Sequence, residues 1–205
     1  LRDRAGVPVS TSAPVPVMER VTDVVAVVLL GLPGLALFPG SVSAGLAITL
    51  LGCIVIVLLF GSRYGDHLLR FPLIRRWKTK LSDSRSGMRR LTLPVPLTVA
   101  VGLGFLAWMS EGVALWVILK GLDADISLFW ALPIYAASTL VGALATSPGG
   151  LVGTEGTMVA LLLQSGLDRS AASAGTLLVR LVTLWFAVVI GLAALACLNR
   201  RNEIR

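Results

Sequence analysis

The chain has 205 residues, of which 56% are hydrophobic and only 14% are charged, and its formal net charge is +7. An average soluble domain carries about 25% charged residues, so this composition excludes an ordinary water-soluble globular protein. Apolar runs recur that reach the roughly 20 residues needed to cross a hydrocarbon core of about 30 Å. We therefore predict an all-α fold, a polytopic bundle of transmembrane helices, organised as a single membrane domain over residues 1–205.

The first two predicted spans form a helical hairpin that leads into a basic loop. The first span, residues 19–38, starts within "MERVTDVV" and contains Pro33 as a kink, and the second, residues 42–60, follows the turn signal "FPGS". The loop 61–93 carries nine basic and two acidic residues between Arg63 and Arg90. A nucleic-acid patch would also be basic, but a basic loop between spans indicates the cytoplasmic side by the positive-inside rule. We expect no nucleic-acid partner. Whether segment 67–81 lies at the headgroup level or forms an ordinary solvated linker stays open.

The remaining spans are predicted at 95–119, 128–146 and 171–198, with a shorter helix at 154–167. If the basic loop is cytoplasmic, the fourth span returns to the cytoplasmic side. The last span must end there too, because Arg200 and Arg201 follow it directly. Segment 151–167 must therefore travel outward, yet it holds only about 11 uninterrupted helix-forming residues, too few to cross alone. A half-helix preceded by a break near mid-depth satisfies both conditions.

The segment "SPGGLVGTEG", residues 147–156, has the composition of such a break. Pro148 lacks an N–H and disfavours helical geometry in the residue before it, so the fourth span is expected to stop there. Gly149 and Gly150 allow backbone angles that other residues resist. Thr154 is expected to cap the half-helix, and Glu155 to lie in its first turn, where the helix dipole favours a carboxylate.

Three charged residues are predicted near the middle of the membrane. At about 1.5 Å per helical residue, Glu155 lies roughly 20 Å and Arg180 roughly 18 Å below Asp168, and Glu111 lies roughly 14 Å below Lys120. Each unpaired charge at that depth costs about 2.5–3.5 kcal/mol on insertion scales. We therefore predict a contact between Glu155 and Arg180, with Glu111 as a competing or additional acid.

An ionisable cluster beside a broken helix indicates a transport site, because interrupted helices near mid-membrane expose dipole ends and backbone carbonyls. A buried ion pair with a purely structural role is the alternative. The residues predicted to bind or translocate a substrate are Pro148, Gly149, Gly150, Glu155, Arg180 and Glu111. A secondary set, Glu19, Arg20 and Asp23, opens the first span near the inner surface, where local pairing is the simpler interpretation.

Three motifs in this order resemble those of the lysylphosphatidylglycerol synthase transmembrane-region family, also called flippase-like domain proteins. They are "ERVTDVV" at 19–25, "SPGGLVGTEG" at 147–156 and "GTLLVRLVTLWFAVVIG" at 175–191. The resemblance covers essentially all of this chain but only the C-terminal part of the family's domain, so we expect a C-terminal fragment of a longer membrane domain. The family commonly has glycine where Val152 stands here, and this sequence has Gly153 instead.

The resemblance implies a role for each motif and a class of cargo. Glu19, Arg20 and Asp23 match the family's first motif, Pro148, Gly149, Gly150 and Glu155 the second, and Arg180 the third. In fuller relatives this domain is associated with flipping an aminoacylated phospholipid, while a separate soluble domain performs aminoacyl transfer. We expect this chain to translocate a phospholipid, glycolipid or polyprenyl-linked lipid in a prokaryotic plasma membrane, with the basic loop and the C-terminus cytoplasmic.

Two further functions stay open. The chain could present lipid to a synthase or glycosyltransferase domain elsewhere, or act as a non-catalytic membrane scaffold. The 205 residues show no nucleophile–base pair, metal cluster or phosphate loop, and His67 is the only histidine. We therefore expect no intrinsic catalytic activity and no cofactor or metal. The expected partners are membrane lipid and either a partner enzyme or further copies of the chain.

Overall fold

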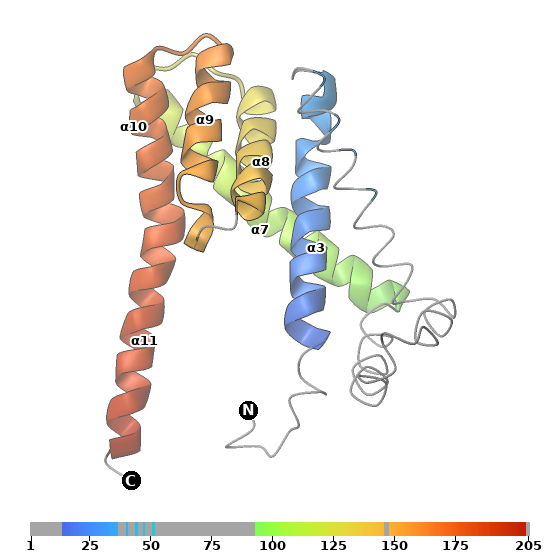
Figure 1. Ribbon diagram of the computed structural model, residues 1–205, viewed down its shortest axis with the longest axis vertical. Coiled ribbons are helices and arrows are strands. Elements are labelled where there is room, and N and C mark those ends of the chain that lie inside the picture. The colour runs from blue at the N-terminus through green and yellow to red at the C-terminus, as the bar shows by residue number, and fades with distance from the viewer. Residues whose placement is uncertain are drawn as a thin grey trace. The chain divides into compact units, whose positions relative to one another are not determined.

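The computed structural model describes residues 14–36, 93–145 and 148–203, together with the single positions 40, 44, 47 and 51. The described residues form helices and turns and contain no strand (Figure 1). The chain divides into two compact units, Leu1–Trp108 and Met109–Arg205, and helix α7 (Pro94–Gly121) crosses the division. The predicted fold class, an all-α membrane bundle with a helix broken at the Pro-Gly-Gly segment, is confirmed. The expectation of one membrane domain stays a prediction.

The first unit is built around α3 (Pro14–Gly31), which continues as the 3-10 helix η1 (Leu32–Ala36). Proline at the first position suits a helix start, because the N–H it lacks has no partner there anyway. The helix therefore begins five residues before the expected start at Glu19, and it changes to 3-10 geometry around Pro33. Within this unit α3 lies close to α7: a Cβ built on Gly104 would stand 3.4 Å from Cβ of Ala26.

Two described helical segments are long and apolar enough to cross a membrane, Pro94–Gly121 and Arg169–Leu198. They have 28 and 30 residues, about 42 and 45 Å at 1.5 Å per residue, against a hydrocarbon core of about 30 Å. The first corresponds to the span predicted at 95–119 and the second to the span predicted at 171–198. Apart from the single positions 44, 47 and 51, the predicted span 42–60 lies outside the described residues, as does nearly all of the basic loop 61–93.

In the second unit α8 (Leu128–Leu144) and α9 (Gly153–Gln164) form a hairpin whose tip is the helix break. Figure 1 shows that α8 descends to the break and that α9 returns from it. The tip contains one 3-10 turn, η3 (Pro148–Gly150), and Ser147, where the span was expected to stop, lies outside the described residues. Helix α9 has 12 residues, or about 18 Å, which is too short to cross the membrane.

Helix α9 ends earlier than the expected residue 167. Gly166 takes φ 93°, the N–H of Leu167 donates to the carbonyl of Leu162, and the N–H of Gly166 donates to that of Leu163. These two bonds form the Schellman arrangement, in which a glycine with positive φ closes the last turn of a helix. The end of the half-helix is therefore set by Gly166.

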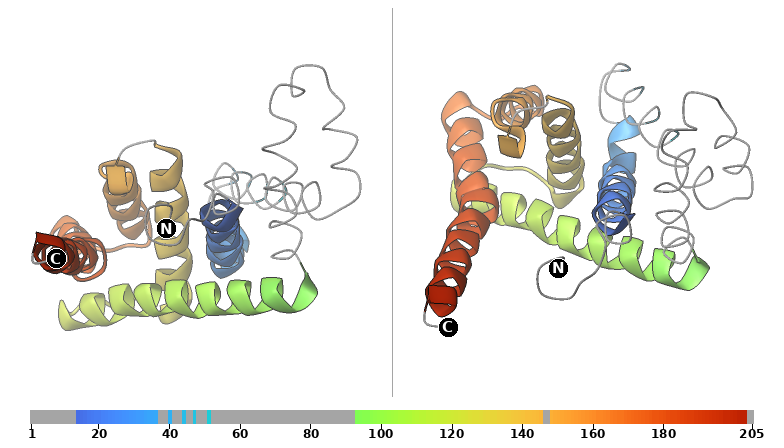
Figure 2. Two further views of the ribbon diagram at one scale, coloured as in Figure 1. Left: turned by 90° about the horizontal axis from the view of Figure 1, so that it is seen from below. Right: turned by 60° about the horizontal axis from the view of Figure 1, so that its bottom comes forward.

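The last helical run starts at α10 (Arg169–Arg180), passes through a π-helical turn, η4 (Leu181–Trp185), and continues as α11 (Phe186–Glu203). Asp168 caps its N-terminus by accepting hydrogen bonds from the N–H groups of Ser170 and Ala171. Helix α9 lies between α8 and α10 (Figures 1 and 2). The buried face of α10 follows helical spacing and consists of Ala171, Ala172, Gly175, Thr176, Val179 and Arg180.

Small residues set how closely these helices approach. A Cβ built on Gly175 would stand 2.5 Å from Cδ2 of Leu119, and one built on Gly112 would stand 2.7 Å from Cδ2 of Leu132. These distances are too short for real contacts, so α10 and α8 each approach the C-terminal part of α7 through a glycine. Small residues at helix crossings are typical of membrane bundles. The two crossings therefore fix the positions of α8 and α10, with Arg180 at the end of α10, relative to Glu111 on α7.

Candidate functional site

The centre of the candidate site is an ion pair between α9 and the end of α10. Nε of Arg180 donates to Oε1 of Glu155 at 2.6 Å, and the two side chains are 10% and 23% exposed. The predicted contact between these residues is thus confirmed. Glu155 lies in the first turn of α9 as expected, and Arg180 is the last residue before the π-turn. Arg180 stands 11 residues along the final run, roughly 17 Å from its start, and mid-membrane depth for the pair stays a prediction.

The helix break also binds Arg180 directly. Nη2 of Arg180 donates to the backbone carbonyl of Gly149 at 2.6 Å. Gly149 and Gly150 have φ angles of 66° and 68°, which glycine adopts without strain. The break therefore turns one backbone carbonyl toward the guanidinium, and Arg180 joins the break, α9 and α10.

This arrangement leaves half of the Glu155 carboxylate unpaired. An arginine often donates two parallel hydrogen bonds to one carboxylate. Here the second donor goes to Gly149, and among the described residues Oε2 of Glu155 is buried without a hydrogen-bond partner. A buried oxygen with no partner has lost its interaction with water, which is costly.

Glu111, expected to compete for Arg180, is bound by Tyr135 instead. The hydroxyl of Tyr135, on α8, donates to Oε2 of Glu111, on α7. Tyr135 is 2% exposed, and Arg180 and Thr183 are further polar neighbours of its hydroxyl. The polar groups of four helical segments thus meet in this part of the unit. Sequence reasoning missed Tyr135, although a tyrosine seven residues into a predicted span, with an acid on the preceding span, was the available signal.

The break is held against α8 by a close contact that sequence reasoning also missed. A Cβ built on Gly142 would stand 1.8 Å from Oγ1 of Thr154, so only glycine fits there. Thr154 is 3% exposed, and it is not the cap of α9: Val152 occupies the N-cap position, without a capping side-chain hydrogen bond. The predicted cap was wrong because Gly153 approaches α8 so closely that the helix already begins there. A Cβ on Gly153 would stand 2.7 Å from Cβ of Ala145.

Val152 adopts an unusual backbone conformation for its residue type. Its φ is 72° and its ψ is −47°, and its side chain is 83% exposed. A β-branched residue is strained at positive φ, where glycine would not be. This is the position at which the resembled family commonly carries glycine. Gly153, one residue later, is needed for space instead.

The secondary residues lie in the other unit and pair locally. Nη1 of Arg20 stands 3.8 Å from Oδ2 of Asp23, one helical turn along α3, and the Arg20 side chain is 79% exposed. Glu19 is exposed as well. Because α3 begins at Pro14, these residues lie within the helix and not at its first turn. The local pairing suggested from their spacing is confirmed for Arg20 and Asp23, and a role of the three residues in binding a substrate stays a prediction.

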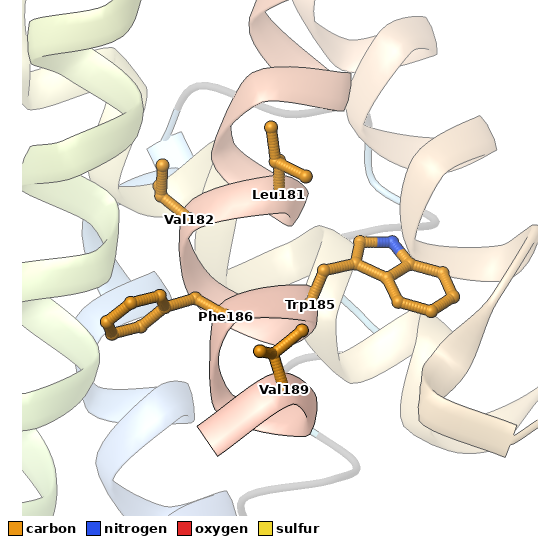
Figure 3. A pocket seen from close by; sticks show the side chains of 5 residues that line it. All are labelled: Leu181, Val182, Trp185, Phe186 and Val189. Atoms are coloured by element: carbon orange, nitrogen blue, oxygen red, sulfur yellow. The ribbon is translucent and has the colours of Figure 1, made fainter. Parts of the chain in front are cut away.

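An apolar hollow follows Arg180 along the final helical run. Its volume is about 530 Å³, and it is lined by Leu181, Val182, Trp185, Phe186 and Val189, all from η4 and α11 (Figure 3). Arg180 directly precedes these residues in the chain. The π-turn inserts one extra residue per turn, a feature found frequently at functional sites. Among the described residues no group of three His, Cys, Asp or Glu side chains is placed to hold a metal ion.

Comparisons with known proteins agree with the motif resemblance. The family described as "Lysylphosphatidylglycerol synthase TM region" matches residues 1–191. A UPF0104 membrane protein of Methanothermobacter thermautotrophicus is 29% identical over 124 residues, covering 60% of this chain and 37% of that protein. Another, from Methanocaldococcus jannaschii, is 24% identical over 193 residues, covering 92% of this chain and 82% of that protein. The chain thus spans little more than a third of the first relative. No solved structure matches it.

Proposed function

Because the chain belongs to the family of the lysylphosphatidylglycerol synthase transmembrane region, we propose that it translocates a lipid across the membrane. The cargo class is a phospholipid, glycolipid or polyprenyl-linked lipid, and the membrane is a prokaryotic plasma membrane with loop 61–93 and the C-terminus on the cytoplasmic side. One observation carries the proposal: a guanidinium and a carboxylate form a largely buried pair at the point where a helix breaks in a bundle of apolar helices.

The geometry suits a headgroup that must be held away from bulk water. Arg180 is nearly buried, and its attraction for an oxyanion is stronger in a medium of low dielectric than in water. A guanidinium has five N–H donors, and the bonds to Glu155 and Gly149 use two of them. The remaining donors can bind the phosphate oxygens that these lipids have in common.

The apolar hollow next to Arg180 suits the rest of a lipid. Its five lining side chains are all hydrophobic, and its volume falls within the range of about 300–1,000 Å³ that is usual for ligand sites. A headgroup at Arg180 and an acyl or prenyl chain along η4 and α11 would therefore each meet a surface of matching chemistry. Glu155 would compensate the charge of Arg180 whenever no headgroup is bound.

Headgroup exposure in proteoliposomes tests this proposal. The full-length protein is reconstituted with fluorescent phospholipids. A membrane-impermeant reductant outside the vesicles destroys label only in the outer leaflet, so the rate at which inner-leaflet label becomes accessible to it is measured. We expect Arg180→Ala and Glu155→Gln to abolish exposure beyond the protein-free rate. The matched controls, Lys120→Ala and Asp125→Asn, disrupt an exposed ion pair at the C-terminal end of α7 and should keep the wild-type rate.

Circular dichroism and gel filtration of each variant establish that it is folded and inserted. Exposure that both site variants retain would contradict the proposal. A folded wild type that translocates none of the anionic, zwitterionic and cationic lipids tested would instead favour a membrane subunit that presents lipid to a partner enzyme, or a scaffold.

A further inference from the structure

The unpaired oxygen of Glu155 indicates a second ligand at the candidate site. Oε1 of Glu155 is bound by Arg180, whereas Oε2 is buried and, within the described part of the chain, has no partner. The arginine donor that could have bound Oε2 is bound to the carbonyl of Gly149. The break thus diverts half of the guanidinium and leaves one carboxylate oxygen free to accept a proton.

Among the described residues, no other group around Glu155 is as well placed to accept that proton. Helix α9 lies between α8 and α10, and the charged group facing Glu155 from α10 is Arg180. On α8 the titratable group is Tyr135, whose hydroxyl donates to Glu111 of α7. The 3-10 turn η3 contributes only the backbone carbonyl of Gly149. Glu111 is engaged by Tyr135, so Glu155 is the acid whose charge state changes most directly with the occupancy of Arg180.

We propose that Glu155 is a proton-binding site coupled to Arg180, so that an anion binding to Arg180 is accompanied by uptake of one proton at Oε2 of Glu155. Without a ligand, Glu155 and Arg180 neutralise each other. A phosphate oxyanion that takes over Arg180 would leave the carboxylate as an uncompensated charge inside the membrane, which is costly. One proton from solvent converts it to a neutral carboxyl group, and no other bond forms or breaks.

This coupling deepens the proposed function and rests on it for the identity of the anion, a monoanionic phosphate diester. Because linkage is reciprocal, binding that takes up a proton becomes tighter as pH falls. Over the pH range in which binding takes up one proton, the affinity should change by about tenfold per pH unit, and it should level off on either side of that range. The reverse step would give Glu155 a role in translocation. Loss of the proton from Glu155 would restore its pairing with Arg180 and release the bound anion.

Proton uptake can be measured on the wild-type chain without any substitution. The full-length protein in detergent is titrated with short-chain phosphatidylglycerol in weakly buffered solution containing a pH indicator. Binding is followed in parallel by calorimetry. Dimethyl phosphate, which carries the same monoanionic diester without acyl chains, is the second probe. Neither probe titrates near neutral pH, so the indicator reports the protein alone.

We expect about one proton to be taken up per phosphatidylglycerol bound, and an affinity that rises as pH falls. Uptake with dimethyl phosphate as well would identify a free oxyanion as a sufficient ligand, whereas uptake with the lipid alone would identify the lipid headgroup; both results support the coupling. In Glu155→Gln, which resembles the protonated form, uptake should be lost and the affinity should no longer depend on pH. Asp125→Asn, the same change at the exposed pair, should behave like the wild type.

Binding of phosphatidylglycerol without proton uptake would overturn the coupling. If the protein still translocated lipid in proteoliposomes, the proposed function would survive that result. Absence of binding together with absence of translocation would overturn both proposals. Where Glu155→Gln does not fold, Glu155→Asp keeps a titratable acid at the site and should still take up a proton on binding. Lipid binding without proton uptake in that folded variant would also contradict the proposal.

Discussion

Two pairs of oppositely charged side chains lie in the unit Met109–Arg205, one at the helix break and one between the last turn of α7 and the segment that follows it. Arg180 and Glu155 approach to 2.6 Å with side chains 10% and 23% exposed, and they are 25 residues apart in sequence. Lys120 and Asp125 approach to 3.1 Å with side chains 45% and 103% exposed, five residues apart. The chemistry is the same and the surroundings differ. Water can replace either member of the exposed pair, whereas only the partner compensates a charge at the break.

The largest expected effect is on stability at the break. Arg180→Ala leaves the largely buried carboxylate of Glu155 without its partner, and we expect the free energy of unfolding to fall by about 3–5 kcal/mol. Lys120→Ala should cost about 0–1 kcal/mol, because exposed pairs gain little from their attraction. Chemical denaturation in a folding-compatible detergent measures both. Equal losses in the two variants would show that burial does not distinguish the pairs.

The second effect concerns the contact that holds the break against α8. In Gly142→Ala the new Cβ would lie 1.8 Å from Oγ1 of Thr154, so the hairpin must shift, at a cost of about 1–3 kcal/mol. Adding Thr154→Ala removes that oxygen and should restore part of the loss. Gly156→Ala is the control, since nothing lies within 4 Å of its Cβ, and it should stabilise α9 by about 0.5–1 kcal/mol. Gly142→Ala unfolding at the wild-type temperature would contradict this contact.

A smaller effect is expected at the strained residue of the break. Val152→Gly relieves a positive φ and loses no packing, because the side chain is 83% exposed, so we expect stabilisation of about 1 kcal/mol or less. Val189→Gly, in the helical geometry of α11, should destabilise instead. The difference in melting temperature between these two variants gives the sign. Equal destabilisation by both would mean that Val152 is not strained.

The smallest effect is expected at Asp168, which lies outside the membrane-spanning segment. Hydrogen bonds from the Ser170 side chain and from the N–H of Ala171 lower the pKa of this fully exposed carboxyl group. A lowered pKa in the folded state stabilises the protein above the unfolded pKa, and this contribution is lost as the pH falls through the folded value. Asp168→Ala should therefore melt slightly below the wild type at neutral pH. The difference in melting temperature between the two proteins should disappear in the acidic range just below the usual carboxyl pKa. A difference that did not change with pH would show that the charge of Asp168 does not stabilise this helix start.

Local sequence signals explain why much of the break could be predicted. Pro148 and the two glycines after it interrupt a helix through their own backbone chemistry, whatever surrounds them. Pairing of Glu155 with Arg180 followed from depth along two helices and from the cost of unpaired charge in lipid. Thr154 was assigned a cap from a local rule that the approach of α9 to α8 overrides. Its real contact, with Gly142, depends on how two helices cross, which no local pattern specifies.

By itself the sequence determined the fold class, the position of the long spans within the described residues, and the break between α8 and α9. Run length, hydrophobicity and the backbone limits of proline and glycine are properties of neighbouring residues. Only the tertiary structure decided that Tyr135 binds Glu111, that Gly149 takes the second donor of Arg180, and that Oε2 of Glu155 has no partner in the described part of the chain. These outcomes depend on how the packed helices are rotated and how closely they approach. Gly112, Gly142 and Gly175 allow approaches so close that a single added methyl group would clash with the neighbouring helix.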